Sequence, residues 1–287
     1  MIQQPTITLN NGVKMPMVGF GVFQIPDPDV CQKAVEEAIK TGYRLIDTAE
    51  AYGNEEAVGK AIKASGVPRE ELFITTKAFI QHINYEGAKE AFEESLRKLD
   101  TDYIDLYLLH QPVGDTFGAW RALEELYKDG KIRAIGVSNF EDGQLANLAI
   151  FNDVIPAVNQ IELHVFNQKD DSVAYQASKG VQVESWGAFA EGRFDVFNNP
   201  VLKAIADKYG KTTAQVMLRW QLQRGIVSLS KSAKPERVRQ NFDIFDFELS
   251  DDDMAQIKTL NTNTTVFADH HEAATFELLA GFVGKSF

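Results

Sequence analysis

Eight short runs of β-branched, leucine and aromatic residues alternate with longer amphipathic stretches along most of this 287-residue chain. The runs cover residues 17–21, 43–47, 72–77, 103–110, 132–139, 157–162, 181–185 and 225–230. Between them, apolar residues recur at spacings of three and four, for example over 31–40, 86–99 and 119–128, which is the α-helical period. This alternation predicts parallel strands joined by crossover helices, and eight such units are the number that closes a (β/α)8 barrel.

An open, doubly wound sheet is the competing architecture. Its most useful signature would be a GxGxxG pattern after the first strand, and the residues after 17–21 lack that pattern. The length agrees with the barrel, because α/β barrels routinely span about 200–250 residues or more as one domain. We therefore expect a single α/β TIM-barrel domain over residues 1–287.

The two ends of the chain lie outside the repeating pattern. Residues 6–16, TITLNNGVKMP, carry the pair Asn11-Gly12 between two short strand-like runs, which predicts a β-hairpin with a type I′ turn. We expect this hairpin at the N-terminal end, or bottom, of the barrel. From Asn261 onward the periodicity fades, so we expect a C-terminal loop or tail over the opposite face, where barrels carry active sites. No role can be assigned in that tail to Phe267 or to the adjacent pair His270-His271.

The charge and the cysteine content exclude several classes of function. Asp and Glu number 41 against 29 Lys and Arg, giving a net charge of −12. A chain this acidic is a poor general binder of nucleic acid or anionic membranes, so we expect neither partner. The single cysteine, Cys31, excludes an internal disulfide framework, and no apolar run approaches the roughly 18 residues of a spanning helix. The N-terminus shows no signal-peptide pattern, so we expect a cytoplasmic protein. We further expect a monomer with no bound metal.

Three consecutive predicted strands end on ionisable side chains, namely Asp47, Lys77 and His110. Tyr52 follows Asp47 by five residues, in the loop after the same strand. The C-terminal ends of parallel barrel strands form one rim, which carries the active site in essentially every characterised barrel enzyme. Each residue alone has a structural explanation, such as a turn cap or a solvated strand end. The coincidence of four on adjacent units predicts a shared site.

Together these side chains suit a general acid directed at a carbonyl oxygen. The phenol of Tyr52 has an ordinary pKa of about 10, and a neighbouring ammonium group, Lys77, is expected to lower that pKa. Asp47 would keep the lysine charged and in place, and His110 could orient a substrate oxygen. Because the sequence has no evident nucleophile elbow or metal cluster, a hydride from a cofactor is the natural complement of this acid.

Several segments, in the same order along the chain, resemble the aldo-keto reductase superfamily. They are GYRLIDTAEAYGNE at 42–55, TK at 76–77, DYIDLYLLHQP at 102–112, KIRAIGVSNF at 131–140, VNQIELH at 158–164 and KSAKPERVRQNFDIFDFELS at 231–250. The short HQP segment and the acidic composition are most similar to the bacterial 2,5-diketo-D-gluconate and glyoxal reductase branch. The resemblance implies an oxidoreductase that reduces carbonyl groups, with Asp47, Tyr52, Lys77 and His110 as catalytic residues.

The resemblance also implies a groove for NADPH or NADP+ along the same rim. Its residues would be Gly21, Val22, Asp47, Ser138, Asn139, Gln160, Trp186, Gly187, Lys231, Ser232, Arg237, Gln240 and Asn241. The polar groups of Ser138, Asn139 and Gln160 suit a nicotinamide carboxamide, and Trp186 would stack on the ring. A basic segment at 231–237, next to a predicted helix start, suits a 2′-phosphate. We therefore expect NADPH to be preferred over NADH.

The implied substrate residues are Phe23, Tyr52, Phe79, His110 and Gln111. Phe79 and Gln111 stand where many members of the superfamily carry tryptophan, so we expect a more open and less aromatic mouth than is usual. We expect the substrate to be a small polar carbonyl compound, for example an α-dicarbonyl or a keto-sugar acid.

Two other functions compete with this interpretation. A barrel that binds a nucleotide could serve as a redox-sensing subunit of a larger assembly, but such a sensor has no need for a tuned acid. A metal-dependent hydrolase or isomerase is disfavoured because His110 and Asp47 have few further ligands near them on the predicted rim.

Overall fold

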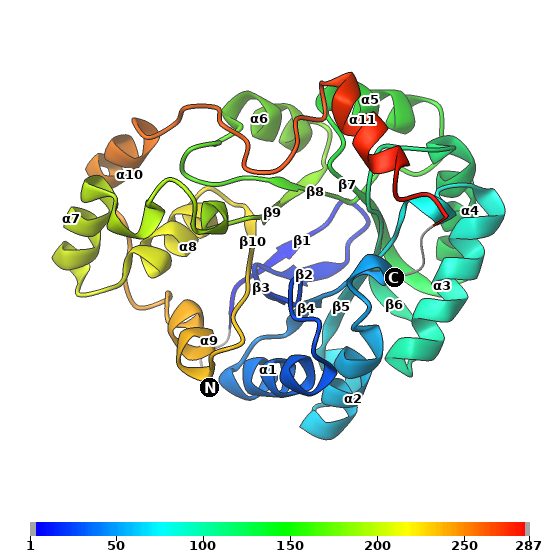
Figure 1. Cartoon of the computed structure of the whole chain (residues 1–287), viewed down its shortest axis with the longest axis horizontal. Helices are drawn as coiled ribbons and strands as arrows, with labels where there is room; N and C mark the ends of the chain where they lie inside the picture. Colours follow the sequence, from blue (N-terminus) through cyan, green and yellow to red (C-terminus); the bar gives the residue numbers. More distant parts are fainter. Residues whose placement is uncertain (1–3, 285–287) are drawn as a thin grey trace.

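The computed structural model describes residues 4–284, and within them eight parallel strands close into a barrel (Figure 1). The strands follow one another around the barrel in chain order, and the last pairs with the first. They are β3 (Val18–Gly21), β4 (Leu45–Asp47), β5 (Phe73–Ala78), β6 (Ile104–Leu109), β7 (Ile132–Ser138), β8 (Val158–Glu162), β9 (Gln182–Trp186) and β10 (Val227–Ser230). Each overlaps one of the predicted runs, so the barrel fold is confirmed.

Helices surround the barrel, most of them in the crossovers between successive strands (Figure 1). The α-helices are α1 (Pro28–Thr41), α2 (Glu55–Ser65), α3 (Tyr85–Leu99), α4 (Thr116–Lys128), α5 (Asp142–Ile150), α6 (Asp170–Ser178), α7 (Pro200–Tyr209), α8 (Thr213–Gln223), α9 (Pro235–Phe242), α10 (Asp251–Lys258) and α11 (Ala273–Ala280). Short 3-10 turns are η1 (Glu50–Tyr52), η2 (Arg69–Glu71), η3 (Ile80–His82), η4 (Ala190–Gly192) and η5 (Val196–Asn198). Across residues 4–284, none of the helices has the length and apolarity needed to cross a membrane.

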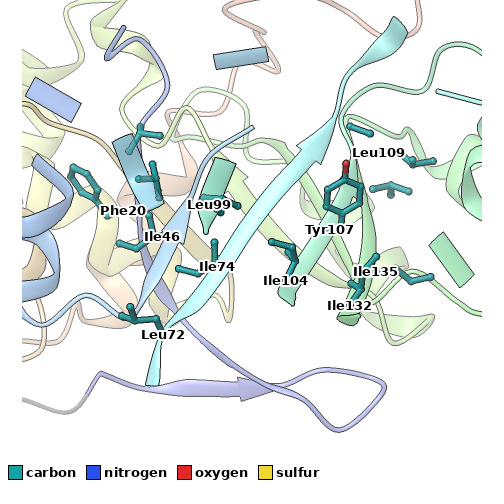
Figure 2. Packing of buried hydrophobic residues seen from close by; sticks show 14 of the residues in the cluster. Phe20, Ile46, Leu72, Ile74, Leu99, Ile104, Tyr107, Leu109, Ile132 and Ile135 are labelled. Carbon is teal, nitrogen blue, oxygen red and sulfur yellow. The ribbon is translucent and has the colours of Figure 1, made fainter. Parts of the chain in front are cut away.

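Buried side chains lie on both sides of the barrel strands, because successive strand residues point to opposite faces. The outward-facing set includes Phe20, Ile46, Ile74, Tyr107 and Ile135, which form one cluster with apolar residues of the surrounding helices (Figure 2). Each such side chain contributes roughly 1.5–3 kcal/mol when it is fully buried. This layer holds the strand ends in fixed positions around the rim.

The inward-facing residues form a separate cluster with the N-terminal hairpin. Leu45 and Leu108 of the barrel interior share that cluster with Leu9 and Met15. The hairpin strands are β1 (Thr6–Thr8) and β2 (Lys14–Pro16), which pair antiparallel. The hairpin therefore closes the bottom of the barrel, as the sequence predicts.

The turn of this hairpin differs from the prediction. The amide of Gly12 donates to Leu9 O (2.9 Å), so Asn10 and Asn11 are the central residues of the turn. Within residues 9–13 only Gly12 has a positive φ, 86°. A type I′ turn needs positive φ at both central residues, so the prediction of that turn is wrong. The loop is the three-residue kind, with a left-handed glycine after the turn, and the side chain of Asn11 donates to Arg133 O (2.9 Å).

The C-terminal segment contains a helix that the sequence did not predict. Residues from Asn261 cross the rim, and α11 follows over Ala273–Ala280. Only Thr275 of this helix is buried, and Leu278 is 63% exposed, so the segment lacks the apolar stripe that marks a core helix. Its position over the active-site face, however, agrees with the prediction, because Leu278 and Leu279 line the rim cavity described below.

Candidate active site

Asp47 and Lys77 form a buried ion pair where β4 and β5 end. The Nζ atom of Lys77 donates to both carboxylate oxygens of Asp47, at 2.8 Å each, and to Thr48 O at 2.8 Å. The Lys77 side chain is fully buried and the Asp47 side chain is 5% exposed. Burial is the largest single influence and would lower the pKa of Lys77, but Asp47 and its other neighbours together outweigh it, and the pKa is raised. Lys77 is therefore a charged group held in one position.

The hydroxyl of Tyr52 lies 3.4 Å from Lys77 Nζ. Tyr52 ends η1, which begins at Glu50, and Glu50 connects this turn to the segment after β5. Its carboxylate accepts hydrogen bonds from the backbone amide of Phe79 (2.8 Å) and from the side chain of Gln81 (2.9 Å). These bonds hold the turn, and with it Tyr52, against the rim.

Burial raises the pKa of Tyr52 to about 12. Lys77 lowers the pKa of this phenol, as expected, but its effect is smaller than that of burial, and Asp47 opposes it. The lowering expected from Lys77 is present, but burial outweighs it and the pKa of Tyr52 is raised. The phenol stays protonated at neutral pH, so it remains a proton donor.

His110 directly follows β6, and its ring lies 5.7 Å from that of Tyr52. Burial, followed by the charge of Lys77, lowers the pKa of His110 well below its ordinary value, so the imidazole is neutral. The Nδ1 atom is buried and has no hydrogen-bond partner among the described residues. Because a buried orphan N–H is rarely tolerated, we infer that Nε2 carries the proton. His110 is thus a neutral hydrogen-bond donor.

A cavity of about 710 Å³ opens at this end of the barrel, and Asp47, Tyr52 and His110 line it. Lys77 lies behind Asp47, outside the lining. All of the predicted substrate residues reach the cavity, namely Phe23, Tyr52, Phe79, His110 and Gln111. The strand ends thus bring the four predicted catalytic side chains to one place.

Most predicted cofactor residues line the same cavity. These are Gly21, Asp47, Ser138, Asn139, Gln160, Trp186, Gly187, Lys231 and Arg237. A smaller cavity of about 260 Å³ shares Lys231 and Arg237 with it and is also lined by Ser232, Gln240 and Asn241. Val22 lines neither cavity and its side chain is fully buried, so its assignment to the cofactor site stays a prediction.

Asn139 organises the rim between β6 and β9. Its Nδ2 donates to His110 O (3.0 Å), and its Oδ1 accepts from Nε1 of Trp186 (2.9 Å). The residue has a φ of 62°, in the left-handed region that asparagine tolerates better than most residues. Asn139 therefore holds the indole of Trp186 and the backbone of His110 in fixed positions.

Aromatic and apolar residues that the sequence did not assign enclose the mouth. Phe267 packs 5.4 Å from Trp186 and 6.5 Å from Phe23, measured between ring centroids. Further contributions come from the C-terminal segment and from the loop after β9, namely Phe189, Phe197, Leu278, Leu279 and Phe282. The mouth therefore has aromatic walls, which come from segments where the sequence shows no recognisable pattern.

Two polar residues of the site also follow only from the structure. His270 lies at the mouth, where Nε2 is 2.8 Å from Oε1 of Gln111. Glu184, on β9, lies inside the barrel and accepts a hydrogen bond from Nε2 of Gln160 (2.8 Å). In residues 4–284 no three His, Cys, Asp or Glu side chains are grouped so that they could hold a metal ion.

Comparisons with known proteins agree with one another. Residues 18–262 match the model of the Aldo/keto reductase family. The chain is 49% identical over 262 residues to the glyoxal reductase of Bacillus subtilis (strain 168), covering 91% of this chain and 94% of that protein. It is 45% identical over 287 residues to the morphine 6-dehydrogenase of Pseudomonas putida, covering 95% and 97%. The crystal structure of the Bombyx mori aldo-keto reductase in complex with NADP superposes with a TM-score of 0.89 at 36% identity, covering 93% and 96%.

Proposed function

The chain belongs to the aldo/keto reductase family, and on that premise we propose that it reduces aldehydes or ketones to alcohols with NADPH, using Tyr52 as the proton donor. The observation that carries the proposal is the arrangement of Tyr52 3.4 Å from Lys77, which is paired with Asp47, beside the neutral His110 in one cavity. A binding module would have no use for a phenol held in this environment.

The residues present fit the cofactor. The amide oxygen of Gln160 makes no hydrogen bond within the described residues, so it can accept one from a carboxamide. Trp186 offers an indole face, and the bases Lys231 and Arg237 lie where the two cavities meet, beside Ser232. Arginine binds phosphate through paired hydrogen bonds, which supports a preference for NADPH over NADH.

Bound NADPH would supply a hydride to the carbonyl carbon. His110 donates a hydrogen bond from Nε2 to the carbonyl oxygen and orients it. Tyr52 transfers its hydroxyl proton to that oxygen as the C=O double bond becomes a C–O single bond, which completes the alcohol. The charge left on the phenolate is stabilised by Lys77, and a proton from water restores the phenol.

Two substrate classes are supported by different observations. Small polar carbonyls, such as α-dicarbonyls or keto-sugar acids, agree with the similarity to a glyoxal reductase. A carbonyl on a bulky apolar or aromatic body agrees with the mouth around Phe23, Phe79 and Phe267, and with the similarity to a morphine 6-dehydrogenase.

We further propose that the chain works as a cytoplasmic monomer, in which the free Cys31 is buried.

The test is the loss of NADPH absorbance with methylglyoxal and with benzaldehyde, in the parent chain and in Tyr52→Phe. We expect Tyr52→Phe to lose at least about 100-fold in kcat and to bind NADPH as the parent does. Tyr85→Phe is the matched control, because that phenol bonds to Glu125 away from the rim cavity. Equal turnover by Tyr52→Phe would disprove the proton donor, and NADPH binding without turnover of any carbonyl would favour the redox-sensing module.

A further inference from the structure

Glu184 is an acidic residue buried inside the barrel, below the rim. It pairs in register with Gln160 of β8 and Val227 of β10, and its exposed fraction is zero. Trp186, two residues later on the same strand, lines the cavity from the same face. Glu184 therefore lies level with Gln160 and one inward-facing position before Trp186.

The surroundings of Glu184 disfavour a negative charge. Its Oε2 accepts one hydrogen bond, from Gln160, and its Oε1 has no partner among the described residues. The charged groups that act on it are Asp47, which is negative, and Lys77, which is already bonded to Asp47. Burial first, and then Asp47, raise the pKa of Glu184 to about 8. At neutral pH the side chain is therefore mostly an uncharged acid.

Both amide hydrogens of Gln160 are used by the two acids. Its Nε2 donates to Oδ2 of Asp47 at 2.9 Å and to Oε2 of Glu184 at 2.8 Å. Turning the amide over would place its oxygen next to Oδ2 of Asp47. This carboxylate has no hydrogen to donate, so that orientation is disfavoured. The amide oxygen is left as the free end of a residue that lines the cavity.

We propose that Glu184 is a positioning residue that holds the amide of Gln160 so that its oxygen is presented to the carboxamide of the nicotinamide. This inference rests on the proposed use of NADPH. It assigns Glu184 no contact with the cofactor or the substrate. Its effect should reach the nicotinamide end of the cofactor and leave the phosphate end, at Lys231 and Arg237, unchanged.

The test compares two ligands in two variants by calorimetry. NADPH contains the nicotinamide, whereas 2′,5′-ADP carries the adenosine and 2′-phosphate without it. Glu184→Met removes the hydrogen-bond acceptor and keeps a side chain of similar length. We expect NADPH to bind about tenfold more weakly, the effect of one lost hydrogen bond, and 2′,5′-ADP to bind as it does to the parent. Glu184→Gln keeps a neutral side chain with an acceptor oxygen, and we expect it to restore NADPH affinity to within about twofold.

Equal weakening of both ligands by Glu184→Met would indicate general damage and overturn the inference, as would unchanged NADPH binding. If the parent protein bound NADPH no more tightly than 2′,5′-ADP, the inference about Glu184 would be overturned, while the phosphate site would still be supported. Parent protein that binds neither would instead refute the proposed cofactor.

A second measurement needs no cofactor and does not depend on Glu184→Met folding. A buried acid with a raised pKa makes the folded protein less stable as pH rises from its unfolded pKa, near 4.3, to its folded pKa. We expect Glu184→Gln and the parent to have similar Tm near pH 5, and the variant to gain an advantage that grows toward about pH 8. A constant difference in Tm across this range would show that Glu184 is not held uncharged.

Discussion

Lys77 donates a hydrogen bond to each oxygen of Asp47, and the two side chains are almost completely enclosed by protein. Removing one member of such a pair leaves the other as an uncompensated buried charge. We expect Lys77→Met to lower the free energy of unfolding by about 3–5 kcal/mol, because Asp47 then loses its counter-ion. Urea unfolding at neutral pH measures this loss.

The double variant Lys77→Met/Asp47→Asn is the control for that prediction. It removes both charges, so it should recover part of the stability lost in Lys77→Met while remaining inactive as a reductase. A double variant as unstable as the single one would mean that lost packing, and not the orphan charge of Asp47, accounts for the effect.

The pKa directions in the site predict a flat pH profile. His110 stays neutral because its pKa lies well below the ordinary value, and Tyr52 stays protonated because its pKa is raised to about 12. Neither group changes charge between about pH 5.5 and 7.5, so kcat/KM for reduction should vary less than about twofold there. The measurement is the initial rate at low substrate in buffers of constant ionic strength. A decline with a midpoint near 6.5 would show that His110 titrates in the working enzyme.

Cofactor preference should depend on Arg237. Its guanidinium lines both rim cavities and has no ion pair in the part of the chain that the structure describes. We expect Arg237→Ala to weaken NADPH binding by at least about tenfold, since a charge-assisted hydrogen bond is lost, and to leave NADH binding nearly unchanged. The matched control is Lys234→Ala, which removes a nearby exposed base that lines neither cavity. Equal loss of NADPH affinity in both variants would indicate a diffuse field of positive charge.

The convergence of the ionisable side chains at the rim could be predicted because of a property of the fold. Parallel strands present their C-terminal ends at one rim, so Asp47, Lys77 and His110 had to converge once the strands were located. The roles of residues within the strands were harder to predict from the sequence. Glu184 is one acid in the run 181–185, and its importance depends on its register with Gln160, which no local pattern encodes.

The hairpin turn and the C-terminal helix escaped prediction for different reasons. Asn11-Gly12 suits a type I′ turn, and its glycine equally suits the left-handed residue that follows a type I turn, so the pair does not separate the two. In α11 the apolar residues Leu278 and Leu279 face the rim cavity, and the helix buries too little of its surface to show an apolar stripe.

Glu162 should control the C-terminal segment, because it bonds that segment to the end of β8. It accepts from the hydroxyl of Thr265 (2.6 Å), from the amide of Val266 (2.7 Å) and from Nε2 of His164 (2.9 Å). Burial raises the pKa of Glu162, but these bonds outweigh it and the pKa is lowered. The stabilisation is therefore present above the unfolded pKa, near 4.3, and is lost as pH falls through the lower folded pKa.

We expect Glu162→Gln to release this segment at neutral pH, because an amide offers one acceptor oxygen to three donors and introduces a donor of its own. Phe267 follows Val266 and packs against Trp186 at the mouth. KM for carbonyl substrates should therefore rise several-fold, while the affinity for 2′,5′-ADP stays the same. Hydrogen exchange at the amide of Val266 should accelerate by about tenfold or more, as a bond to a charged acceptor is lost. Thr265→Val removes one hydroxyl bond and should give a smaller change in both quantities. If exchange at Val266 were as slow in Glu162→Gln as in the parent, the segment would be held by the packing of Phe267 and α11, and the carboxylate would have no controlling role.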